Sequence, residues 1–142
     1  MALNRENAKV YVTNGQSLLV TNLDGTRMRA IRKAGLMRQI TAFDFHNKSG
    51  RIFWADKYTH SIYSAYENGT NTVRIVGSGV AMVESLAVDW IGQNIYWADC
   101  VMQHIEVSKL DGKRRTILFN VRCGKYKITA RFSNRNLIIT SV

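Results

Sequence analysis

The stretch NIYWADCVMQHIEVSKLDG, residues 94–112, contains one apolar run that ends in an acid at Asp99 and a second that ends in Asp111-Gly112. The first run, IYWAD, matches IFWAD at 52–56, which lies 43 residues earlier. The match extends downstream, because HIEVSKLDGK (104–113) aligns with both SIYSAYENGT (61–70) and SLLVTNLDGT (17–26). Internal periods of about 20 to 50 residues are typical of repeat architectures. The sequence therefore predicts a repeat protein.

Other parts of the chain repeat at nearly the same spacing. Upstream of the matched runs, AFDF at 42–45 aligns with AVDW at 87–90, and weaker echoes occur at 11–14 and 138–141. A chain of 142 residues has the size of a single domain. We therefore expect one domain made of repeat units at approximately 1–34, 35–79 and 80–122, followed by an incomplete unit at 123–142.

Each repeat is predicted to contain four short antiparallel strands. Apolar runs alternate with turn signals, and no helical periodicity of sufficient length competes with them. Asp24-Gly25, Asn68-Gly69 and Asp111-Gly112 separate the third and fourth strands, and such dipeptides favour type I′ hairpins, in which both central residues have positive φ. Four antiparallel strands that recur at about 40 to 45 residues are typical of propeller blades. The predicted fold class is therefore all-β, with the antiparallel four-stranded blades of a β-propeller.

The aromatic and acidic residues of the repeated motif are predicted to be structural. Six of the ten carboxylates occupy equivalent repeat positions, and a catalytic acid is seldom needed once per repeat. An acceptor for backbone N–H groups at each strand end is needed every time, and bulky aromatic rings would fill the space between neighbouring blades. The residues assigned to this structural set are Phe53, Trp54, Asp56, Tyr96, Trp97, Asp99, Asp44 and Asp89.

The formal net charge of +10 favours acidic partners. Acidic protein surfaces, glycosaminoglycan surfaces and nucleic acid share this property, but nucleic acid is not expected because no helix-turn-helix, zinc-finger spacing or RNP-like strand accompanies the charge. The first ten residues lack the apolar core of a signal peptide, and no stretch approaches the roughly 20 apolar residues of a membrane span. We expect a solvated basic face and no membrane segment in this chain.

The sequence contains no motif for an enzyme active site or a metal site. It lacks G-x-S-x-G, a phosphate-binding glycine loop and the usual metal-ligand spacings, so no enzymatic activity, cofactor or metal is expected. A catalytic triad assembled from distant residues stays open. His46, His60 and His104 are predicted to be ordinary surface or loop histidines, with pH sensing by one of them as the alternative.

Four residues are candidates for covalent modification. Cys100 and Cys123 permit at most one internal disulfide, and the required Cα separation of about 5.5 Å cannot be read from a sequence. Two free thiols are therefore expected, with a disulfide as the alternative. Asn47 and Asn68 each begin an N-glycosylation tripeptide at a predicted turn. Their modification requires that the chain enters the secretory pathway.

The quoted stretch and its copies carry a family resemblance. Residues 86–119, LAVDWIGQNIYWADCVMQHIEVSKLDGKRRTILF, resemble a YWTD repeat, also called the low-density lipoprotein receptor class B repeat. The resemblance in sequence is strongest to the repeats of the giant receptor-related proteins. FDFHNKSGRIFWADKYTHSIYSAYENGT (43–70) is a second clear copy, and residues 9–32 resemble the later strands of a preceding one. The motif threonine is replaced by Ala55 and Ala98 in the two copies, and the tail at 128–141 has lost the motif's Tyr, Trp and Asp.

The resemblance implies a six-bladed β-propeller in the extracellular part of an endocytic or signalling receptor. Such propellers bind protein ligands across one face or help to release them at acid pH, and calcium belongs to neighbouring modules rather than to the blade. An extracellular or cell-surface location follows from the same resemblance. Carried over by position, the ligand-facing loops follow the motif Asp and precede the Ala-x-Asp strand. Their residues are Arg38, Gln39, Lys57, Tyr58, Met82, Val83, Glu84, Cys100 and Val101.

The number of repeats predicts an open arc of about three of the six blades. Its two bare blade faces would each exceed the few hundred Å² of apolar surface that soluble monomers usually expose, so self-association of the chain is expected. Two alternatives to a receptor binding module stay open. One is a non-functional or decoy receptor fragment. The other is a calcium-dependent propeller hydrolase, which would need unpaired acidic residues that converge on the propeller axis.

Overall fold

The computed structural model describes residues 9–32, 35–46, 48–123, 126–131 and 136–141, which form strands joined by turns and short connections. Among these residues there is no helix long and apolar enough to cross a lipid bilayer. The strands are β1 (Lys9–Thr13), β2 (Leu18–Asn22), β3 (Arg29–Ile31), β4 (Ile40–His46), β5 (Arg51–Asp56), β6 (Ser61–Tyr66), β7 (Val73–Val76), β8 (Val83–Asp89), β9 (Asn94–Asp99), β10 (His104–Lys109), β11 (Thr116–Asn120), β12 (Tyr126–Arg131) and β13 (Asn136–Ser141).

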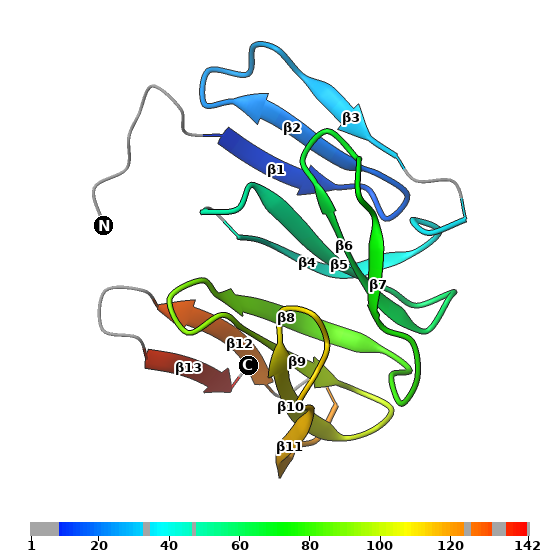
Figure 1. Cartoon of the computed structure of the whole chain (residues 1–142), viewed down its shortest axis with the longest axis vertical. Coiled ribbons are helices and arrows are strands. Elements are labelled where there is room, and N and C mark those ends of the chain that lie inside the picture. The colour runs from blue at the N-terminus through cyan, green and yellow to red at the C-terminus, as the bar shows by residue number, and fades with distance from the viewer. Residues whose placement is uncertain (1–8, 33–34, 47, 124–125, 132–135, 142) are drawn as a thin grey trace.

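The strands form four antiparallel sheets, and within each sheet neighbours in sequence are neighbours in space. The first sheet has the order β1-β2-β3, the second β4-β5-β6-β7, the third β8-β9-β10-β11 and the fourth β12-β13. The first three sheets follow one another along the long axis of the molecule, and the fourth lies beside the third (Figure 1); β8 packs between β4 and β12. This arrangement confirms the predicted fold of successive antiparallel propeller blades. We propose that each sheet corresponds to one of the repeat units.

Alternate residues of β5 face opposite neighbouring sheets. Trp54 is fully buried in a cluster with Leu18 and Val20 of the first sheet. Phe53, which is 1% exposed, lies in a different cluster with Val88 and Ile95 of the third sheet. Because successive side chains of a strand point to opposite faces, a strand covered on both sides must be apolar along its whole length. Each ring contributes on the order of 2 to 3 kcal/mol by burial.

The third sheet repeats this packing. Trp97 is fully buried and shares the cluster of Phe53, whereas Tyr96 packs on the opposite side with Ala87 and Ile105. In both complete sheets the motif tryptophan therefore faces the preceding sheet, and the aromatic residue before it faces the following one. These rings fill the space between blades.

The hairpins that join the last two strands in each of the first three sheets differ from the predicted type I′ turn. Gly25, Gly69 and Gly112 have φ values of 82°, 85° and 85°, but the residue before each glycine does not have positive φ. In the first hairpin the N–H of Gly25 donates to the carbonyl of Asn22, and the N–H of Asn22 donates to the carbonyl of Thr26, both over 3.0 Å. This pattern is a three-residue loop, in which a type I turn precedes a glycine in the left-handed conformation. The prediction was wrong because the dipeptide does not reveal the length of its loop.

The residue before each of these glycines stabilises its turn. Oδ1 of Asp24, Asn68 and Asp111 accepts a hydrogen bond of 2.9 to 3.0 Å from the backbone N–H two residues further on. Side chains of this type commonly bond to nearby backbone in turns. The acids at these positions therefore have a local structural role.

Candidate ligand-binding rim

Asp56, at the end of β5, holds two loops together through its buried carboxylate. Oδ2 accepts hydrogen bonds from the backbone N–H groups of Arg38 over 2.6 Å and Gln39 over 2.9 Å. Oδ1 accepts hydrogen bonds from the backbone N–H groups of Tyr58 over 2.8 Å and Thr59 over 3.1 Å. The carboxylate therefore satisfies four backbone donors that belong to no ladder.

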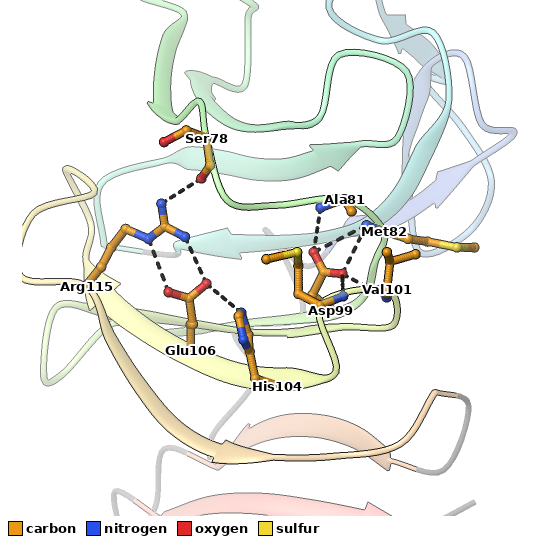
Figure 2. A network of polar contacts seen from close by, with 9 residues as sticks. Ser78, Ala81, Met82, Asp99, Val101, His104, Glu106 and Arg115 are labelled. Carbon is orange, nitrogen blue, oxygen red and sulfur yellow. Dashed lines mark hydrogen bonds and ion pairs between the residues drawn. The ribbon is translucent and has the colours of Figure 1, made fainter.

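Asp99, at the end of β9, repeats this arrangement (Figure 2). Its carboxylate accepts hydrogen bonds from the backbone N–H of Ala81 over 2.7 Å and from that of Met82 over 3.2 Å. It also accepts hydrogen bonds from Val101 over 3.0 Å and Met102 over 2.9 Å. Both aspartates are almost completely buried, with 2% of Asp56 and 1% of Asp99 exposed. A buried carboxylate engaged by four N–H groups is suited to fixing loops rather than to transferring protons.

We define the rim as residues 37–39, 57–60, 81–84 and 100–103, which lie at the ends of the second and third sheets marked by the two aspartates. A backbone hydrogen bond of 2.9 Å from Lys57 to the carbonyl of Gln39 joins the first pair of loops. The corresponding bond of 2.7 Å from Cys100 to the carbonyl of Met82 joins the second pair. The structure thus brings the candidate ligand-facing residues of each repeat together at one place.

The half of the rim in the second sheet is cationic and aromatic. The guanidinium carbon of Arg38 lies 3.8 Å from the ring centroid of Tyr58, a cation–π geometry. Gln39, Lys57, Tyr58 and His60 line an open hollow of about 410 Å³. Arg38 and His60 are exposed, as is 60% of Tyr58. These side chains are available to a ligand.

The half of the rim in the third sheet is largely apolar. Val101 and Met102 are 62% and 43% exposed. Val83, in contrast, is only 4% exposed and belongs to the core cluster between the second and third sheets. Its side chain therefore cannot contact a ligand, although its sequence position placed it among the candidates. The alternation of β8 turns this residue inward and leaves the neighbouring Glu84 exposed.

Cys100 and Cys123 form a disulfide, with their Cα atoms 4.3 Å apart. The expectation of two free thiols was wrong, because the fold brings together two positions that are 23 residues apart. Oε1 of Glu84 lies 3.6 Å from Sγ of Cys123, so the three side chains have the proximity of a metal site. Since the thiolate is the form of cysteine that ligates a metal, the disulfide removes two of these three ligands.

Two of the three histidines are buried, contrary to the expectation of ordinary surface or loop histidines. His46 is 2% exposed, and burial lowers its pKa; its Nδ1 is paired with Oγ of Ser49. His104 is 8% exposed, and its Nε2 lies 3.0 Å from Oε2 of Glu106. Only His60, at the rim, is exposed as expected.

Glu106 is the centre of a polar network between the second and third sheets (Figure 2). It is 4% exposed, and its Oε2 accepts a hydrogen bond of 2.9 Å from Nη2 of Arg115. Nη1 of the same arginine donates to the carbonyl of Ser78 over 2.7 Å. The sequence held a signal for part of this network, because His104 and Glu106 are two residues apart in an alternating strand and so share one face. The contribution of Arg115 depends on the path of β11.

The other paired acids also bind backbone N–H groups. Oδ2 of Asp44 accepts a hydrogen bond of 2.8 Å from Val88 in the next sheet. Oδ1 of Asp89 accepts hydrogen bonds of 3.1 Å from Ile91 and 2.9 Å from Gly92 within its own turn. Asp44 and Asp89 occupy equivalent repeat positions, but Asp44 joins two sheets whereas Asp89 stabilises its own turn.

The two glycosylation candidates differ in what the structure describes. Asn68 is exposed at the turn between β6 and β7, where its Oδ1 accepts hydrogen bonds from the N–H and the hydroxyl of Thr70. Asn47 lies outside the described residues. Glycosylation at either position stays a prediction.

The internal repeat, the sheet order and the inward-facing tryptophans define the chain as an arc of a YWTD-type β-propeller. No protein-family model matches the chain. Low-density lipoprotein receptor-related protein 5 of Mus musculus is 37% identical over 108 residues, which are 75% of this chain and 7% of that protein. Low-density lipoprotein receptor-related protein 8 of Homo sapiens is 30% identical over 130 residues, which are 84% of this chain and 14% of that protein. The chain thus spans a small part of the relatives it matches.

Solved structures show the same fold. A chain in the crystal structure of a nidogen/laminin complex superposes with a TM-score of 0.80 at 23% identity, covering 94% of this chain and 52% of that chain. An auxiliary nutrient binding protein from Bacteroides thetaiotaomicron superposes with a TM-score of 0.74 at 10% identity, covering 99% of this chain and 35% of that one. At these identities the likeness concerns the fold alone.

Proposed function

We propose that the chain is a non-enzymatic binding module of an extracellular, receptor-type ectodomain, and that it binds protein ligands at the rim. The relatives named above are receptor-related proteins, and one structural neighbour is described as a complex with laminin. The observation that carries the proposal is that each motif aspartate is buried and saturated by backbone donors. The loops that these aspartates hold present exposed side chains, among them Arg38, Tyr58 and Val101.

Within the rim the contact residues are the side chains that reach solvent. Of the candidates taken from the sequence, these are Arg38, Gln39, Lys57 and Tyr58 in the second sheet and Met82, Glu84 and Val101 in the third, and the structure adds His60 and Met102. Loops held on a rigid scaffold are common sites of binding. Cys100 contributes through its disulfide, which ties the loop after β9 to the segment that follows β11.

Site-specific photo-crosslinking tests the proposal. A photoreactive amino acid replaces Tyr58 or Val101 at the rim, and a matched control replaces Lys113, which is exposed in the turn at the other end of β10. Each variant is incubated with proteins secreted by cultured cells. We expect a discrete protein adduct at 58 and 101 but not at 113. Adducts formed equally at all three positions, or at 113 alone, would contradict the proposal.

The proposal also includes that the receptor is endocytic and that the chain self-associates. Val12 in β1 is 50% exposed and Phe119 in β11 is 43% exposed, which gives the chain apolar surface for contact with another molecule. Light scattering on the purified protein tests self-association. A mass of twice the monomer is expected, and a compact monomer would contradict it.

A further inference from the structure

The two halves of the rim occupy equivalent positions but have different chemistry. Because Asp56 and Asp99 bind corresponding backbone groups, Arg38 corresponds to Ala81 and Tyr58 corresponds to Val101. One repeat therefore presents a guanidinium and a phenol where the next presents two apolar side chains. A set of equivalent loops with contrasting side chains is suited to a ligand that contains two kinds of group.

The two halves are neighbours in space. Nδ1 of His60, in the cationic half, lies 3.3 Å from the carbonyl oxygen of Ala81 in the apolar half. The sheets beneath them are joined by the cluster that contains Phe53 and Trp97. A single short segment of a ligand can therefore span both halves.

We propose that the rim recognises an extended protein segment in which an acidic side chain lies within a few residues of an apolar one. This inference rests on the proposed function and specifies the chemistry of the partner. The carboxylate is held by Arg38 and Lys57, and the apolar side chain packs on Val101 and Met102. Hydrogen bonds with Asp56 and Asp99 hold the backbone of Arg38, Val101 and Met102. Lys57 is held by the hydrogen bond from its N–H to the carbonyl of Gln39.

The cationic half of the rim has side chains that are suited to binding a carboxylate. Stacking on Tyr58 restricts the guanidinium of Arg38 without consuming its N–H donors, and a planar guanidinium matches the geometry of a carboxylate. Lys57 and His60 line the hollow that Tyr58 also borders. The net charge of +10 adds long-range attraction for an acidic segment.

The apolar half favours a peptide over a sulfated glycan. Val101 is 62% exposed and Met102 is 43% exposed, and a glycan of uniformly negative charge gains nothing from covering them. A segment with one acid and one apolar residue pairs with the cationic half and also buries these two apolar side chains.

Selection of random displayed dodecapeptides on the whole chain tests the inference. We expect the enriched peptides to carry Asp or Glu within about five residues of Leu, Ile, Val, Phe or Met, since an extended chain advances roughly 3.3 Å per residue. Arg38→Glu with Lys57→Glu is expected to weaken the binding of these peptides about tenfold. Peptides newly selected on this variant should no longer be enriched in Asp or Glu. Peptides newly selected on Val101→Ser with Met102→Ser are expected to keep the acid and to lose only the preference for an apolar residue.

The control is Lys113→Glu with Arg114→Glu, which makes the same charge change in the turn between β10 and β11 and should preserve both preferences. Rim-dependent peptides that are only acidic or only apolar would overturn this inference and leave the proposed function standing. Heparin binding that is lost with the Arg38 and Lys57 variant, without peptide binding, would also overturn it. The inference fails if no peptide is enriched, or if none of the rim variants changes the binding of the enriched peptides. In that case, crosslinking of a secreted protein at positions 58 and 101 would still support the proposed function.

Discussion

Oδ2 of Asp44 in β4 accepts a hydrogen bond of 2.8 Å from the backbone N–H of Val88 in β8, the inner strand of the next sheet. The same carboxylate binds the N–H of Phe45 through Oδ1 over 2.8 Å. Burial raises the pKa of Asp44, although these two hydrogen bonds oppose the rise. One acid of the repeat therefore joins two blades at their inner strands.

Asp44→Asn should make the stability difference between variant and wild type depend on pH. A raised pKa means that the folded state binds the proton more tightly than the unfolded state. Wild type therefore gains stability relative to the variant as the pH falls from neutral through the raised pKa toward the ordinary value of 3.8. At neutral pH we expect a difference of no more than about 1 kcal/mol. Urea unfolding across this pH range measures it, and a constant difference would refute the assignment.

Glu67→Gln should weaken the connection between the first and second sheets. Oε1 of Glu67 lies 2.8 Å from Nζ of Lys9 and is also paired with Arg29. Burial raises the pKa of Glu67, but both cations lower it, and its net shift is below the ordinary value of 4.5. The stabilisation is therefore complete above that value and is lost as the pH falls through the lower, folded pKa.

At neutral pH the loss in the Glu67→Gln variant should be about 1 kcal/mol, because the cations are partly exposed. Wild type and variant are compared by denaturant unfolding in low salt and in about 1 M NaCl, which screens exposed charges. The same substitution should lower the pKa of Tyr11, which burial and the charge of Glu67 raise to about 12. If absorbance titration showed no change at Tyr11, this contact would be absent.

Gly112→Ala and Gly25→Ala should differ in cost although both glycines have nearly the same backbone conformation. Their φ values are 85° and 82°, so the strain of about 1 kcal/mol for a left-handed alanine is common to both. A Cβ on Gly112 would collide with the carbonyl of Ile75 in β7, whereas a Cβ on Gly25 would meet nothing within 4 Å. We expect an additional loss of about 1 to 3 kcal/mol for Gly112→Ala. Equal losses in thermal unfolding would show that the third hairpin does not touch the second sheet.

Removal of the disulfide should lower the free energy of unfolding by about 3 kcal/mol. The variant is Cys100→Ser with Cys123→Ser, and its unfolding curve is compared with that of wild type with and without reductant. Only wild type should respond to the reductant. Reaction of the native, oxidised protein with two equivalents of a thiol reagent would rule out the bond.

The repeating part of the fold could be predicted because a strand that is buried on both faces is apolar along its whole length. Ile52 to Ala55 and Ile95 to Ala98 are apolar throughout since neighbouring sheets cover them on each side. The acid that follows each run marks the place where backbone donors leave the ladder. Local rules and repeated spacing were therefore sufficient for the blades.

The remaining features depend on contacts between distant parts of the chain. The pairing of Cys100 with Cys123 requires the path of β10 and β11, and the hydrogen bond from Arg115 to Glu106 spans nine residues. The inward position of Val83 could have been read from the alternation of its strand, but its place next to the rim suggested exposure. None of these contacts recurs in each repeat, so the repeat could not reveal them.

Amide hydrogen exchange measured by NMR shows whether each motif aspartate holds its own pair of rim loops. In wild type the N–H groups of Arg38, Gln39, Ala81 and Met82 should be protected although they lie in loops. In Asp56→Asn the exchange of Arg38 and Gln39 should accelerate, while Ala81 and Met82 stay protected by Asp99. Unprotected rim amides in wild type, or equal acceleration of all four in a variant that keeps the protection of Val88, would show that the aspartates do not hold these loops.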